Sequence, residues 1–145
     1  MAAATDKTQA RRELAEVYLC EAAHEKLSWK GRVDAAFDAV YLLALVVLGA
    51  EQADTYEHPD PAALIAVAKK LRWPESKAAP AICHIAMRYD IEQHLALYGA
   101  GAGNDGDAPA AWSTIDSLEA MLPLAHQMAD ADNLATNGEQ ASGTL

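Results

Sequence analysis

Residues 39–50 read AVYLLALVVLGA, the longest apolar run of this sequence. Crossing a bilayer takes roughly 20 consecutive apolar residues, so this run is too short to be a membrane anchor. A helix that is apolar on all sides is typical of a buried position. We therefore predict a helix from residue 32 or 33 to residue 48, ended by Gly49, at the centre of the fold or in a dimer interface.

The composition favours one all-helical domain. The chain has 145 residues, of which 52% are hydrophobic and only 6% aromatic, so alanine and leucine dominate its apolar content and favour helix. No alternating run indicates a strand, and one domain of this length is ordinary. We predict an all-α, up-and-down bundle of about five helices over residues 1–132, followed by a disordered tail over residues 133–145.

The other helices are bounded by capping residues and helix breakers. Asp60 followed by Pro61 is typical of a helix start, and the Trp73-Pro74 pair is typical of a helix end. A loop rich in Gly, Ala, Asn and Asp is expected at residues 99–110. The further helices are expected at residues 5 or 6 to 29, 61–71, 77–98, and from 113 up to the tail.

The charges are unevenly distributed along the chain. The formal net charge is -10, and every Lys and Arg lies at or before Arg88. The acidic C-terminal part should repel nucleic acid, so RNA could be contacted only through a local basic patch in the first part. The N-terminus shows no apolar signal core, which predicts a cytoplasmic protein with no membrane association.

The first helix has an apolar stripe at helical spacing. Its members are expected to face the core, and both cysteines of the chain, Cys20 and Cys83, are expected to be reduced core side chains. The stripe consists of Leu14, Val17, Cys20, His24 and Leu27.

Two polar pairs on the first helices have spacings that suggest chemistry. Glu21 and His24 form a Glu-x-x-His pair, but no second copy accompanies it, so a hydrogen-bonded core histidine is favoured over a metal ligand. Asp34 and Asp38 are more simply explained by an ion pair with Lys30 or Arg32 than by paired catalytic carboxylates. We expect no metal and no cofactor.

The strongest polar pattern is MRYDIEQH at residues 87–94, where five residues separate Arg88 from His94. With the stretch GRVDAAF at residues 31–37, the following apolar helix and His58, it resembles the HEPN family of small helical bundles over about residues 29–98. The paired aromatics of the family pattern are replaced by Asp34 and Ala35.

The resemblance implies a fold and a chemistry. Arg88 would hold the scissile phosphate and His94 would transfer the proton in a metal-independent endoribonuclease, usually in a homodimer cleft. An inactive binding relative in a nucleic-acid-linked or toxin–antitoxin system is the other possibility. Because six positions turn a straight helix by about 240°, the two residues need a helix break or a second subunit to meet.

The residues expected to bind the RNA substrate are basic side chains and a histidine on the face of Arg88. They are Lys69, Lys70, Arg72 and His84. The alternative function, from a different class, is a small acidic adaptor or chaperone that binds a partner protein's helix in an apolar groove.

Overall fold

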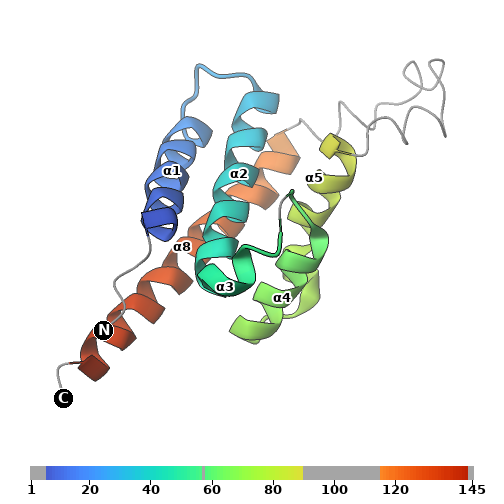
Figure 1. Ribbon diagram of the computed structural model, residues 1–145. Helices are drawn as coiled ribbons and strands as arrows, with labels where there is room; N and C mark the ends of the chain where they lie inside the picture. The colour runs from blue at the N-terminus through green and yellow to red at the C-terminus, as the bar shows by residue number, and fades with distance from the viewer. Residues whose placement is uncertain (1–5, 57, 90–114, 144–145) are drawn as a thin grey trace.

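The computed structural model describes residues 6–56, 58–89 and 115–143, and within these residues the helices are joined by turns and short loops, with no strand (Figure 1). The predicted all-α bundle is confirmed. The α-helices are α1 (Asp6–Ala22), α2 (Trp29–Leu48), α3 (Ala50–Ala53), α4 (Pro61–Leu71), α5 (Ala79–Tyr89) and α8 (Ile115–Gly143), and a short 3-10 helix, η1 (Glu75–Ala78), precedes α5.

Helix α2 is the centre of the bundle, as its apolar run predicts. It packs against α1 on one side, against α4 and α5 on the other, and against α8, which crosses behind it (Figure 1). Its side chains from Val33 to Leu48 are almost all buried within this one chain. Of the two positions predicted for this helix, the centre of the fold is therefore the one found here, since α1, α4, α5 and α8 cover its apolar surface; the homodimer stays a prediction.

The boundary between α1 and α2 differs from the prediction. The first helix ends at Ala22 instead of residue 29, and α2 begins at Trp29. Ser28 caps α2, since its hydroxyl oxygen accepts a 3.0 Å hydrogen bond from the amide of Gly31. Gly31 is therefore inside the first turn of α2 and does not interrupt a helix, because the serine cap outweighs the weak helix propensity of one glycine.

We expect Ser28→Ala to lower the free energy of unfolding by about 1 kcal/mol, because the first turn of α2 loses its side-chain acceptor. Urea denaturation followed by circular dichroism measures this loss. Ser28→Asp keeps an acceptor at the same place and should remain close to the original stability. Equal losses in both variants would contradict the capping role.

The register of α1 also differs from the prediction. The residues of α1 that pack into the core are Ala15 and Ala22, with Tyr18 and Leu19 partly buried. The expected stripe is wrong: Leu14 and Val17 are 43% and 51% exposed, and Cys20, His24 and Leu27 are exposed as well. Small alanines let the axis of α1 approach α2 closely, and this close packing selects the alanine face over the larger leucine and valine.

Helix α4 has the predicted bounds and the predicted cap. The Asp60 carboxylate accepts a 2.9 Å hydrogen bond from the amide of Ala62, and Pro61 occupies the first helical position. Tyr41 of α2 holds the preceding loop, since its hydroxyl accepts from the amide of Asp60 at 2.9 Å and donates to the carbonyl of His58 at 3.2 Å. Burial raises the pKa of Tyr41 above its usual value.

The last two helices agree with the prediction only in part. Helix α5 begins at Ala79, two residues after the predicted start, while the predicted end at residue 98 and the loop at 99–110 lie outside the described residues. Helix α8 continues to Gly143, where we predicted a disordered tail from residue 133. Extending an existing helix adds a hydrogen bond for each residue fixed, which favours continuation of α8 into this polar sequence.

Candidate functional site

A buried histidine links α5 to α2. His84 is 2% exposed, and its Nε2 atom lies 3.0 Å from Oδ1 of Asp34. The ring of His84 also lies against the ring of Phe37, with 4.7 Å between the two centroids. Helical spacing explains the arrangement, because Asp34 and Phe37 are three residues apart and therefore share the face of α2 that α5 covers.

The carboxylate of Asp34 also has a lysine as a neighbour. Its Oδ2 atom lies 3.0 Å from Nζ of Lys30, which confirms the predicted ion pair with that lysine. Arg32 has a different role, since its Nε donates a 2.8 Å hydrogen bond to the carbonyl of Ala22 and its guanidinium lies over the ring of Trp29. Asp34 is therefore held next to His84 by a neighbouring positive charge.

The ring of His84 lacks well-formed hydrogen bonds. The contact of Nε2 with Asp34 has the distance of an ion pair but does not have hydrogen-bond geometry. Within the described part of the chain, neither ring nitrogen has a hydrogen-bond partner, and both are closed to solvent. Since most buried polar atoms in proteins are paired, this histidine is an exception that suggests a further binding partner.

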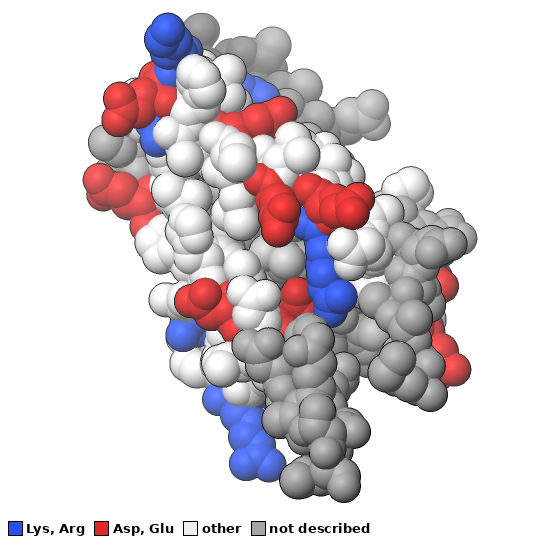
Figure 2. Space-filling model, turned by 90° about the vertical axis from the view of Figure 1, so that its left-hand side faces the viewer, with Lys and Arg blue, Asp and Glu red and all other residues white. Residues whose placement is uncertain are grey.

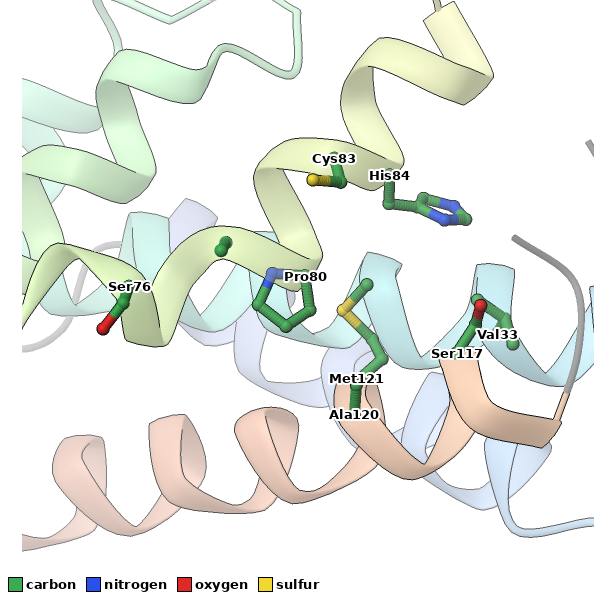
Figure 3. A pocket seen from close by; sticks show the side chains of 9 residues that line it. Val33, Ser76, Pro80, Cys83, His84, Ser117, Ala120 and Met121 are labelled. Carbon is green, nitrogen blue, oxygen red and sulfur yellow. The ribbon is translucent and has the colours of Figure 1, made fainter. Parts of the chain in front are cut away.

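A pocket of about 440 Å³ lies beside this histidine. Figure 3 shows that its walls come from α5 with η1 and from α8, and that α2 contributes its floor. We call this pocket the α5–α8 groove. It is lined by Val33, Ser76, Ala79, Pro80, Cys83, His84, Ser117, Ala120 and Met121.

The α5–α8 groove is apolar, with a few polar groups. Its polar lining is confined to two serines, the thiol of Cys83 and the ring of His84, and no Lys or Arg is among the described residues that line it. Apolar pockets of this size with a few polar groups are typical binding sites. Without cations, the groove is poorly suited to hold phosphate groups.

The two predicted catalytic residues are not brought together by the described structure. Arg88 lies in the last described turn of α5, and only its backbone is described. His94 lies outside the described residues. The predicted catalytic pair therefore remains a prediction.

The predicted substrate-binding residues are divided among different places. Lys69, Lys70 and Arg72 lie at the C-terminal end of α4, and α5 then runs from that end of the bundle to the other (Figure 1). Arg88 is about 14 Å along the axis of α5 from its start at Ala79. These basic residues and Arg88 are thus at opposite ends of α5.

The local roles of these basic residues are partly structural. The ammonium group of Lys70 donates to the carbonyl of Val47, near the C-terminal end of α2. Arg72 ends α4 in the left-handed conformation with φ 60°. His84, the fourth predicted substrate-binding residue, is buried in the groove wall instead of lying on a basic surface.

The predicted core role of His24 is wrong. It lies exposed in the turn after α1, where its Nδ1 accepts a 3.3 Å hydrogen bond from the amide of Lys26. Among the described residues no cluster of His, Cys, Asp or Glu could hold a metal ion. The two cysteines are not joined: Cys20 is exposed, contrary to the prediction, and Cys83 is partly buried in the groove.

The opposite side of the molecule presents α1. Figure 2 shows uncharged surface there, bordered by acidic side chains and by several basic ones. The exposed Leu14 and Val17 belong to α1 and are next in sequence to the exposed Glu13 and Glu16. Across the described residues, none of the helices combines the length and the apolar character that crossing a membrane requires.

The sequence analysis missed most residues of the α5–α8 groove. Ser76, Ser117 and Met121 have no pattern that marks them, and they meet only because α5 and α8 both pack on α2.

Comparison of the chain with known protein families, curated proteins and solved structures finds no match.

Proposed function

We propose that this protein is a binding module that takes the apolar face of a partner protein's amphipathic helix in the α5–α8 groove. The observation that carries the proposal is the lining of the groove, which is apolar and has no cation among its described residues. Recognition of an amphipathic helix in a hydrophobic groove is a common mode of protein association.

The dimensions of the groove support a helical occupant. On one wall, Ser76, Ala79, Pro80 and Cys83 recur at spacings of three and four residues, so the wall is about 10 Å long. A bound helix presents successive anchors about 5–6 Å apart. Two or three anchors of one helix face therefore fit along this wall.

The charges indicate what surrounds the anchors. The chain has a net charge of -10, and the exposed carboxylates of Glu75 and Glu119 are adjacent in sequence to the groove residues Ser76 and Ala120. An interface of this kind attracts a partner of opposite charge. The proposed partner helix therefore has Lys or Arg flanking its apolar anchors.

The partner is to be identified by photo-crosslinking in cells that produce the full chain, with p-benzoylphenylalanine in place of the exposed Glu119, next in sequence to the groove residue Ala120, and, in a control, in place of Glu13 on α1. The segment crosslinked only from position 119 is then synthesised and titrated against the purified protein. The proposal requires that this segment forms a basic amphipathic helix and binds directly.

We expect Ala120→Trp to weaken binding of that peptide about 100-fold or more, because an indole occupies the space of a central anchor. Leu134→Trp is the matched control, since Leu134 is a 74% exposed residue of the same helix outside the groove. Isothermal titration calorimetry measures both affinities. Equal binding by the two variants, or a crosslinked segment without an apolar helical face, would overturn the proposal.

As the second candidate function we propose a HEPN-like, metal-independent endoribonuclease. One observation favours it: the two helices that carry the sequence resemblance are in contact through His84 of α5 and Asp34 of α2, and Arg88 follows His84 by one helical turn. In this function Arg88 holds the scissile phosphate and His94 transfers the proton.

Cleavage of labelled RNAs, including tRNA, by purified protein in the presence of EDTA tests the second candidate. We expect Arg88→Ala and His94→Ala each to reduce the cleavage rate by about 100-fold or more. His126→Ala, which changes an exposed histidine of α8, is the matched control and should leave the rate unchanged. Absence of cleavage, or equal rates in all variants, would exclude this function.

A further inference from the structure

The ring of His84 is a buried polar group of the α5–α8 groove that lacks a hydrogen bond. It is 2% exposed, it lines the groove, and both of its nitrogens are buried without a hydrogen-bond partner in the described structure. In Figure 3 the ring reaches from α5 toward Ser117 of α8. A group bound in the groove would therefore meet a buried polar atom with free hydrogen-bonding capacity.

The neighbours of the ring determine which kind of group it can bind. Asp34 lies 3.0 Å from Nε2 and is itself 3.0 Å from the ammonium of Lys30. An ionised carboxylate only accepts hydrogen bonds, so the proton of a neutral imidazole belongs on Nε2. The Nδ1 atom then has a lone pair and requires a donor.

We propose that the central anchor of the bound helix is an aromatic side chain with a polar hydrogen, Trp or Tyr, which donates a hydrogen bond to Nδ1 of His84. This inference rests on the proposed function as a helix-binding module. A purely aliphatic anchor would fill the groove and leave Nδ1 unpaired, whereas an indole N–H or a phenol O–H satisfies it.

The groove provides space for such an anchor. Its volume is about 440 Å³, and small side chains, including Ala79 and Ala120, form its walls. The unbranched Met121 lies in the same lining, and its flexible side chain can adjust to an inserted aromatic ring. Trp and Tyr are also the side chains most enriched at the centres of protein interfaces.

The first test is selection of a displayed library of amphipathic helical peptides, randomised at three anchor positions, on the full chain and on His84→Leu. We expect Trp or Tyr to dominate one anchor position with the unaltered protein, and aliphatic residues or Phe to replace them with His84→Leu. Aliphatic anchors with both proteins would overturn this inference and leave the proposed function standing. The same selection on Ala120→Trp shows whether enrichment depends on the groove. Peptides enriched equally on the unaltered protein and on Ala120→Trp would overturn the proposed function.

A selected peptide with a Tyr anchor allows a sharper comparison with its Phe counterpart. The loss of one hydrogen bond should weaken binding to the unaltered protein by about 3- to 10-fold and should have no effect on binding to His84→Leu. A Tyr-to-Phe ratio that is the same for both proteins would contradict the contact.

Nitrogen NMR of the His84 ring gives a readout that does not depend on a variant. When the Tyr peptide binds, the Nδ1 resonance should move upfield, as expected for a lone pair that accepts a hydrogen bond, and the Phe peptide should leave it nearly unchanged. An Nδ1 resonance that responds equally to both peptides would overturn the inference. Because this measurement uses the unaltered protein, it does not depend on whether His84→Leu folds.

Discussion

Replacing Phe37 with alanine is expected to lower the free energy of unfolding by about 3–5 kcal/mol. Phe37 is fully buried in α2, and its ring contacts His84 of α5 and lies 6.0 Å from the ring of Tyr41. Removing it leaves a cavity at the contact between α2 and α5, which are rigid elements that can close the gap only in part. Urea denaturation followed by circular dichroism measures the loss.

The control for Phe37→Ala is Leu14→Ala. Leu14 is 43% exposed on α1, so its truncation should change the free energy of unfolding by no more than about 0.5 kcal/mol, as is usual for surface positions. This comparison also tests the register of α1, because the apolar stripe in the sequence places Leu14 in the core. A loss of several kcal/mol for Leu14→Ala would mean that the stripe faces inward.

The elements predicted well from the sequence are those with strong local signals. Helix α4 begins and ends as predicted because Asp60 caps it, Pro61 fits its first turn and Trp73-Pro74 follows its end. The apolar run of α2 has no polar face, which predicts a helix at the centre of the fold or in a dimer interface, and α2 is central in this chain. In these segments, caps, breakers and composition all favour one structure.

The register of α1 could not be predicted in the same way. Its leucine and valine recur at helical spacing, but the face that packs on α2 is formed by Ala15 and Ala22. Which face packs depends on how closely two helix axes can approach, and that distance is a property of the pair of helices. The sequence of α1 alone does not determine this distance.

The candidate site was predicted only at single positions. His84 was named because it shares a helix face with Arg88, yet its partners Asp34 and Phe37 come from a helix about fifty residues earlier. The groove beside it joins residues of α2, α5 and α8 whose side chains are mostly small. Small side chains have no distinctive spacing, so a site made of them becomes visible only when the helices are assembled.

Replacing Arg12 with methionine is expected to lower the free energy of unfolding by about 3 kcal/mol. The guanidinium of Arg12 in α1 donates two 3.0 Å hydrogen bonds to the carboxylate of Asp132 in α8, and Asp132 is 7% exposed. Methionine keeps much of the apolar stem but leaves the carboxylate buried without these donors. The expected loss is at the lower end for buried pairs because the Arg12 side chain is still 28% exposed.

The double variant Arg12→Met with Asp132→Leu separates the ion pair from the packing around it. We expect it to regain most of the stability lost by either single variant, because an apolar pair no longer leaves a buried charge unpaired. Lys7→Met, which removes one partner of Asp54 in a pair whose side chains are 59% and 50% exposed, should have a much smaller effect. Additive losses in the double variant, measured by urea denaturation, would mean that the Arg12–Asp132 contact does not hold α1 against α8. Strong coupling would instead show that this contact, between residues 120 positions apart, joins the first and last described helices of the bundle.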